Sequence, residues 1–127
     1  MIAVDTSALM AIVLGETEAS ACMQILELET NVVISAGTVA EALIVAGRRN
    51  VGEEVRRLIE GLDFEIVSVT PASALRVAAA YARWGRGVHP AGLNFGDCFS
   101  YEVAKELSCR LLYVGEDFSE TDLESAL

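Results

Sequence analysis

The sequence predicts a single α/β domain with a central parallel sheet of four to five strands and helices on both faces. Short apolar runs alternate with helical stretches throughout residues 1–127. The runs are apolar at consecutive positions, which is typical of strands buried on both sides of a parallel sheet. Strands that alternate with helices indicate an α/β fold. The length suits one domain, and 53% hydrophobic residues are enough for a core.

The expected elements follow one another in a regular order. Strands are expected at residues 2–4, 32–34, 65–67 and 111–114. Helices are expected at residues 7–14, 18–28, 37–49, 52–61, 71–84 and 94–107. Thr70 followed by Pro71 is typical of a helix start, because threonine caps and proline suits the first helical position. Residues 121–124 also indicate a helix start, with Asp122 as its cap rather than as a ligand.

The most irregular connection is expected at residues 85–93. This stretch contains three glycines and one proline, which are the residues that interrupt helices and strands most strongly. It leads directly into the helix that carries Asp97. We therefore expect this loop to border a functional site.

The net charge of −10, from 19 acidic and 9 basic residues, bears on the class of partner. It argues against broad, sequence-independent nucleic-acid binding, which needs a basic surface. The arginines are nevertheless clustered in residues 48–57 and 76–86. They predict either a local basic rim or solvated helix positions paired with Glu53, Glu54 and Glu60.

Cysteine and histidine usage restricts the kinds of site. Cys22, Cys98 and Cys109 make an odd number without a CxxC pair, and His89 is the single histidine. A disulfide framework and a structural zinc site are therefore not expected, and a reducing cytosol is. No apolar run reaches the roughly 18 residues of a membrane span, and Asp5 interrupts the apolar start, so we expect neither a membrane segment nor a signal peptide.

Four acidic residues lie at corresponding ends of the predicted strands and helices. Asp5 closes the first apolar run, and Asp117 follows the last one. Glu41 and Asp97 lie near the starts of two helices. Ligands of open α/β sheets bind at the carboxyl ends of the strands. Carboxylates collected there repel one another, and a hard divalent cation neutralises them. The sequence thus predicts a Mg²⁺ site in which Mn²⁺ can substitute.

Each carboxylate also has a purely structural interpretation. Asp5 could cap the following helix, although Ser7 could do so instead. Residues 38–41 and residues 94–97 both have capping-box spacing, which would give Glu41 and Asp97 a local role. Asp117 could be a turn aspartate. The arrangement of all four together, rather than any one of them, favours a shared site.

Four segments of the chain contain the four acidic residues: 4–9 (VDTSAL), 35–43 (SAGTVAEAL), 91–101 (AGLNFGDCFSY) and 111–118 (LLYVGEDF). In these segments the chain resembles PIN-domain ribonucleases of the VapC toxin type. The resemblance covers nearly the whole chain. The block around Asp97 is its most specific part, and the order and spacing of the four segments add to it.

The resemblance implies a PIN-like fold, a magnesium-dependent endoribonuclease, a homodimer, and a small antitoxin that covers the active site. Asp5, Glu41 and Asp97 match the family's core acidic residues. Asp117 matches a fourth acidic position that is less uniform, and Thr6 matches a hydroxyl position near the metal. The implied reaction is hydrolysis of an RNA phosphodiester by a metal-activated water, which leaves a 5′ phosphate and a 3′ hydroxyl.

Two loop residues and two rival functions complete the expectations. Arg86 and His89 are candidate RNA contacts, or else solvated loop residues. One rival function is a phospho-acceptor signalling domain with an acidic Mg²⁺ pocket. Such a domain needs a lysine after the last strand. The only lysine of this chain, Lys105, lies in a predicted helix before the last strand. The other rival is a non-catalytic interaction module of the same fold. Metal binding distinguishes that module from an enzyme.

Overall fold

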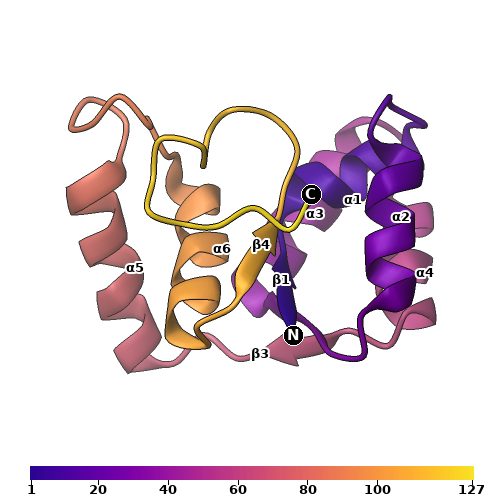
Figure 1. Ribbon diagram of the computed structural model, residues 1–127, viewed down its shortest axis with the longest axis horizontal. Helices are drawn as coiled ribbons and strands as arrows, with labels where there is room; N and C mark the ends of the chain where they lie inside the picture. The colour runs from indigo at the N-terminus through magenta and orange to yellow at the C-terminus, as the bar shows by residue number, and fades with distance from the viewer.

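The computed structural model describes all of residues 1–127 and contains one four-stranded parallel sheet with six helices around it (Figure 1). The strands are β1 (Ile2–Val4), β2 (Val32–Ser35), β3 (Glu65–Val67) and β4 (Arg110–Leu112). The helices are α1 (Thr6–Val13), α2 (Ala19–Leu28), α3 (Ala36–Arg48), α4 (Gly52–Gly61), α5 (Pro71–Trp84) and α6 (Phe95–Glu106). The strand order is β3-β2-β1-β4, so the expected α/β architecture is confirmed.

The sheet separates two hydrophobic cores, because successive side chains of a strand point to opposite faces. Ile2, Val4 and Ile34 pack into the core shared with α1, α2, α3 and α4. Ala3 and Val33 pack into the core shared with α5 and α6. In Figure 1, α5 and α6 accordingly lie on one side of the strands, and α2 and α4 lie on the other.

Strand β1 lies in the centre of the sheet and β3 forms one edge. Ile2 is paired with Val32 of β2 on one side and with Arg110 of β4 on the other. Strands β1 and β2 are buried throughout, as their sequences predict. The same prediction is wrong for β3, whose Glu65 and Ile66 are exposed. The other edge strand, β4, is covered by residues 124–126, whereas β3 pairs with β2 alone.

The segment after β4 forms no helix, and it returns to β4 at one parallel bridge between Leu111 and Ser125. The backbone N–H of Leu111 donates to the Glu124 carbonyl, and the N–H of Ala126 donates to the Leu111 carbonyl. The helix expected from residue 121 is therefore absent. Asp122 does not cap a helix, because its carboxylate accepts hydrogen bonds from Tyr101 Oη at 2.8 Å and Lys105 Nζ at 3.0 Å.

Most predicted boundaries agree with the structure to within one or two residues. Helix α5 begins as expected, with Thr70 as its N-cap and Pro71 at its first position. Strand β4 ends at Leu112, two residues earlier than predicted. No helix combines the length and the apolar character that crossing a membrane requires.

Candidate functional site

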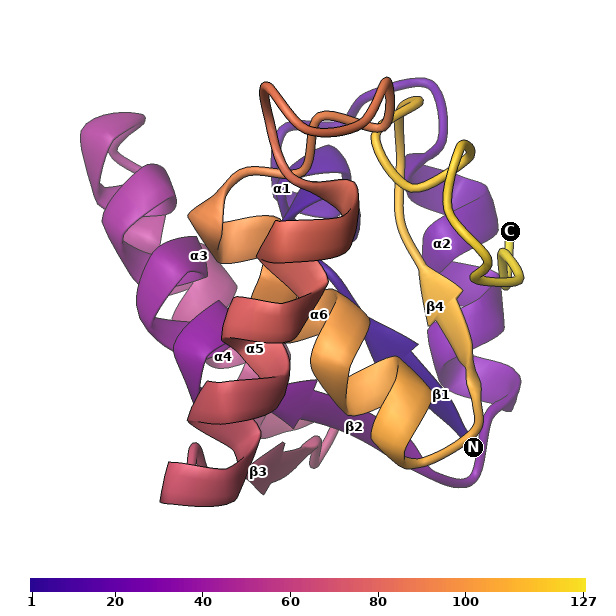
Figure 2. The same cartoon turned by 90° about the vertical axis from the view of Figure 1, so that its left-hand side faces the viewer.

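The four acidic residues singled out in the sequence lie at the carboxyl end of the sheet. Asp5 joins β1 to α1, and its backbone N–H donates to the Leu112 carbonyl at the end of β4. Glu41 lies in the second turn of α3, Asp97 in the first turn of α6, and Asp117 in the segment after β4. Figure 2 shows the starts of α1 and α6 and the chain that follows β4 at the same end of the molecule. The charges of Asp5, Asp117 and Glu41 all act on Asp97, so the fold brings the four carboxylates together.

Asp5 is almost fully buried, and both of its carboxylate oxygens accept hydrogen bonds. Oδ2 accepts from the backbone N–H of Ser7 at 3.0 Å and from Ser7 Oγ at 2.7 Å, whereas Oδ1 accepts from Ser100 Oγ at 2.6 Å. Asp5, not Ser7, is therefore the N-cap of α1. The Ser7 hydroxyl instead accepts from the backbone N–H of Val114, which ties the start of α1 to the chain after β4.

Ser100 is a site residue that the sequence analysis missed. It lies in the middle of α6 and is fully buried. Nothing in the local sequence marks it, because a serine inside a helix has no capping or turn signature. The one signal for Ser100 is its spacing from Asp97. Residues three apart on a helix lie on the same face, so Ser100 is expected on the face of the helix that carries Asp97.

Glu41 approaches the site from α3 and is held there by a hydroxyl group. Thr6 Oγ1 donates to Glu41 Oε1 at 2.7 Å. The capping-box interpretation of Glu41 is wrong, because α3 begins at Ala36 and is capped by Ser35. Burial raises the pKa of Glu41; the hydrogen bond from Thr6 lowers it, and the charge of Asp5 raises it further.

Asp97 has the structural role proposed for it and also faces the other carboxylates. Asp97 Oδ2 accepts from the backbone N–H of Asn94 at 3.0 Å, and Asn94 Oδ1 accepts from the backbone N–H of Asp97 at 2.8 Å, which completes a capping box. Burial raises the pKa of Asp97 to about 7 against the opposing effect of the Asn94 hydrogen bond, and the charges of Asp5, Asp117 and Glu41 raise it further.

No basic side chain compensates this concentration of negative charge. The ion pairs of the protein all involve other carboxylates, chiefly those on α4 and at the ends of α2 and α6. The neighbours that do contact the site are neutral hydroxyl and backbone N–H groups. An oxygen-only donor set with uncompensated negative charge suits a hard divalent cation such as Mg²⁺ or Mn²⁺.

The carboxylates do not form a ready-made cage. No three acidic, histidine or cysteine side chains converge closely enough to hold an ion between them. Mg²⁺ does not require such a cage, since it usually keeps several waters and binds through one or two carboxylates together with substrate phosphates. These residues would therefore fit a partly hydrated cation.

Two glycines allow α3 and α6 to approach closely beside the site. A Cβ atom on Gly96 would lie 1.7 Å from Glu41 Oε2, so the missing side chain makes room for the Glu41 carboxylate. A Cβ atom on Gly37 would lie 2.4 Å from the ring of Phe99. The sequence analysis did not single out either glycine, because the requirement comes from a neighbouring helix.

The two candidate RNA contacts in the loop at residues 85–93 differ in their surroundings. Arg86 is exposed and lines a hollow of about 310 Å³ together with Tyr81, Asn94 and Phe95. The ring of His89 instead packs edge-on against Trp84 at 4.7 Å, and its Nδ1 accepts from the backbone N–H of Ala91. Arg86 thus lies near Asn94, the N-cap of the helix that carries Asp97, whereas His89 helps to hold the loop in place.

A basic and apolar margin also borders the site on the α3 side. Arg48 is exposed and lines a hollow of about 430 Å³ that also includes Glu41 and Phe95. Phe95 is 72% exposed and Ile44 is 59% exposed, so large apolar side chains reach the surface here. By contrast, Arg56 and Arg57 pair with Glu53 and so fulfil the alternative expectation of solvated, paired helix positions.

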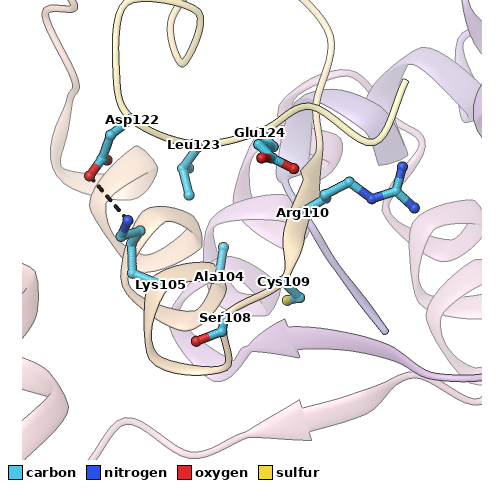
Figure 3. Close-up of a pocket in the computed structure, with 8 residues that line it drawn as sticks. All are labelled: Ala104, Lys105, Ser108, Cys109, Arg110, Asp122, Leu123 and Glu124. Carbon is cyan, nitrogen blue, oxygen red and sulfur yellow. Dashed lines mark hydrogen bonds and ion pairs between the residues drawn. The ribbon is translucent and has the colours of Figure 1, made fainter.

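Another hollow, of about 290 Å³, lies at the opposite end of α6 and β4 (Figure 3). It contains none of the four carboxylates of the site. Lys105 lines it and is paired with Asp122 there. Lys105 therefore lies at the far end of α6 from Asp97, whereas a phospho-acceptor site would need it beside the acidic pocket.

Comparison with known proteins gives consistent results. The family model described as PIN domain matches residues 2–124. Ribonuclease VapC36 of Mycobacterium tuberculosis is 45% identical over 95% of this chain and 90% of its own length, and ribonuclease VapC42 of the same species is 42% identical over 97% of both. The crystal structure of VapC20, a sarcin–ricin loop cleaving toxin of M. tuberculosis, has a TM-score of 0.79 at 17% identity and covers 97% of this chain and 96% of that one. A toxin–antitoxin complex from Klebsiella pneumoniae has a TM-score of 0.72 at 19% identity, covering 96% and 93%.

Replacing Gly96 with alanine is expected to weaken metal binding without unfolding the protein. The new methyl group would displace the Glu41 carboxylate, which is the flexible end of a side chain, and break its bond to Thr6. Mn²⁺ affinity should fall about tenfold, which is the usual loss when a contact that orients a metal ligand is removed. The midpoint of urea unfolding should stay near that of the wild type. Gly47→Ala on α3 is the matched control, because its Cβ meets nothing within 4 Å. Unchanged Mn²⁺ affinity in Gly96→Ala would contradict the importance of Glu41.

Replacing Asp97 with asparagine is expected to stabilise the metal-free protein at high pH. The pKa of Asp97 rises from 3.8 to about 7 on folding, so its stabilising contribution is complete below pH 3.8 and is lost as pH rises through 7. Asparagine keeps the capping oxygen and does not titrate. The whole pKa difference corresponds to about 4 kcal/mol in the free energy of unfolding. Because water penetration reduces this electrostatic effect, we expect Asp97→Asn to raise the free energy of unfolding by about 1–2 kcal/mol at pH 8.

Urea denaturation in EDTA between pH 4.5 and 8 measures this effect. The difference between Asp97→Asn and wild type should grow steadily with pH. Asp122→Asn is a control for which the expected change in stability has the opposite sign. Burial acts to raise the pKa of Asp122, but the hydrogen bonds from Tyr101 and Lys105 outweigh burial, so the pKa is lowered. The Asp122 variant should therefore lose stability at pH 8. A difference for Asp97→Asn that does not vary with pH would contradict the electrostatic account.

Proposed function

The chain belongs to the PIN-domain family, and on this basis we propose that it is a Mg²⁺- or Mn²⁺-dependent endoribonuclease, the toxin of a toxin–antitoxin pair. The observation that carries this proposal is the set of four carboxylates at one end of the sheet, two of them less than 10% exposed and none paired with a basic side chain. The relatives named as ribonucleases match almost the whole chain and support the same reaction.

In this proposal Asp5 and Asp97 hold the cation, together with Glu41 or Asp117. When bound, the cation supplies a nucleophilic water and neutralises charge on the phosphate oxygens. The hydrogen bonds from Ser7 and Ser100 fix the orientation of Asp5, and Thr6 fixes that of Glu41. A carboxylate fixed in this way needs little reorganisation when the phosphate arrives.

The RNA backbone is proposed to contact Arg86 and Arg48, which line two hollows that share Phe95, and the hollow of Arg48 also includes Glu41. Both are exposed, and neither forms an ion pair within the protein. They supply a local positive margin on a chain whose net charge is −10. Arg86 is favoured over His89, because the His89 ring is already packed against Trp84.

Two other functions remain to be compared with this one. A non-catalytic interaction module would use the same fold and the same acidic surface to bind a basic partner. The phospho-acceptor alternative is disfavoured, because Lys105 is paired with Asp122 at the far end of α6. The cleavage experiment below separates the enzyme from the interaction module.

Metal-dependent cleavage of RNA is the first expected outcome. A mixed pool of structured RNAs should be cut in Mn²⁺ or Mg²⁺ and left intact in EDTA, with 5′ phosphates on the products. Asp5→Asn and Asp97→Asn should lower the rate by about 100-fold or more, since charge stabilisation of this kind is worth that much. Glu124→Gln, an acidic residue of the distant hollow, is the control. Wild-type protein that binds Mn²⁺ tightly but cuts no RNA would favour the interaction module.

The partner is proposed to be a small antitoxin that inserts an arginine among the carboxylates. Clustered carboxylates attract the bidentate arginine side chain, and the Klebsiella structure of the same fold is a toxin–antitoxin complex. The protein encoded by the neighbouring reading frame should bind the wild type and lose at least tenfold in affinity for the Asp5→Asn, Asp97→Asn double variant by isothermal titration. Undiminished affinity for the double variant would place the antitoxin elsewhere.

Homodimerisation is proposed through the apolar face formed by α3, α5 and α6. Exposed apolar surface bordered by polar residues marks interaction sites, and Phe95, Ile44 and Tyr81 are all at least 40% exposed here. Phe95→Asp should shift the molecular mass in light scattering from two chains to one. Leu75→Asp, at an exposed position of α5 outside the hollow that Tyr81 and Phe95 line, should leave the dimer intact. A dimer that survives Phe95→Asp would contradict this assignment of the face.

A further inference from the structure

A chain of buried hydroxyl groups leads from α3 through α6 to the Asp5 carboxylate. Ser100 Oγ on α6 donates to Asp5 Oδ1 at 2.6 Å. Thr38 Oγ1 on α3 lies 3.1 Å from Ser100 Oγ. Both hydroxyl-bearing residues are completely buried, and Asp5 is 3% exposed. No solvent-facing group takes part in this chain.

The direction of the chain follows from counting protons. A serine hydroxyl carries one proton, and an ionised carboxylate can only accept. The Ser100 proton is committed to Asp5, so Thr38 must be the donor in its contact with Ser100. The hydrogen bonds therefore run from Thr38 to Ser100 to Asp5. Each bond in such a series polarises the next, and the bond to the charged end is the strongest.

This chain connects the three elements that carry the central carboxylates. Ser100 lies one turn after Asp97 on α6, Thr38 lies one turn before Glu41 on α3, and Asp5 follows β1. The other Asp5 oxygen is held by Ser7, so the bonds from Ser7 and from Ser100 together restrict the rotation of the carboxylate about its own axis. Without the Ser100 proton, Oδ1 would face a buried space with no donor.

We propose that Ser100, oriented by Thr38, is a positioning residue that sets the angle at which Asp5 presents its carboxylate to the divalent cation. The proposal rests on the proposed function and deepens it. Partners that orient the ligands of a metal typically change affinity or activity about 10–100-fold when they are removed. A serine that merely fills the core would have no such effect, because its replacement by alanine removes a single oxygen atom.

Mn²⁺ binding to the full chain, measured by isothermal titration, tests this proposal without relying on activity. Ser100→Ala should weaken Mn²⁺ binding about tenfold and lower kcat on RNA, with KM for RNA unchanged. Thr38→Val keeps the shape but removes the first donor, and should weaken binding about threefold. The two effects should not add, because Thr38 acts only through Ser100. Ser73→Ala, a buried serine that belongs to the α5 capping box, is the control and should lower stability without changing Mn²⁺ affinity.

The outcomes separate this inference from the function on which it rests. Wild-type protein that binds Mn²⁺, with Ser100→Ala within twofold of it, would overturn the positioning role and leave the nuclease proposal standing. Wild-type protein that neither binds Mn²⁺ nor cuts RNA would overturn both. If Ser100→Ala does not fold, as judged by circular dichroism, Thr38→Val decides: unchanged affinity in that variant would overturn the proposal, and weakened affinity would support it.

Discussion

The close packing of α3 against α6 is the constraint on which the acidic site depends. Asp5 reaches the site from the end of a central strand, but Glu41 and Asp97 reach it from two helices on opposite faces of the sheet. These helices can meet only because Gly37 accommodates the Phe99 ring and Gly96 accommodates the Glu41 carboxylate. A larger side chain at either glycine would separate the carboxylates before it affected the core.

Collecting carboxylates in this way has an electrostatic cost that the protein itself does not offset. The groups that surround them are hydroxyls and backbone N–H groups, which orient the carboxylates but bring no positive charge. Burial raises the pKa of Asp97, and the neighbouring charges of Asp5, Asp117 and Glu41 raise it further. The chain itself therefore organises the geometry of the site, and no basic side chain of the protein pairs with its four carboxylates.

The sequence predicted the fold class, nearly all element boundaries and the location of the four carboxylates, because alternating apolar runs and strand ends are local signals. It predicted the local contacts less well. Asp5 rather than Ser7 caps α1, and Asp122 binds Tyr101 and Lys105 instead of starting a helix. Ser100 was not predicted at all, since its contact with Asp5 joins residues 95 positions apart. Such long-range contacts leave no mark on the sequence around either residue.

The pairing of β1 with β4 has a consequence for the timing of synthesis. The second residue of the chain lies beside residue 110, so the central strand lacks one neighbour until most of the protein has been made. Non-local pairing of this kind forms late in folding, because the entropy of closing a long loop must be overcome first. Ser7, which holds Asp5, also needs the backbone of Val114. A nascent chain on the ribosome therefore lacks an assembled acidic site until residues 110–117 have emerged.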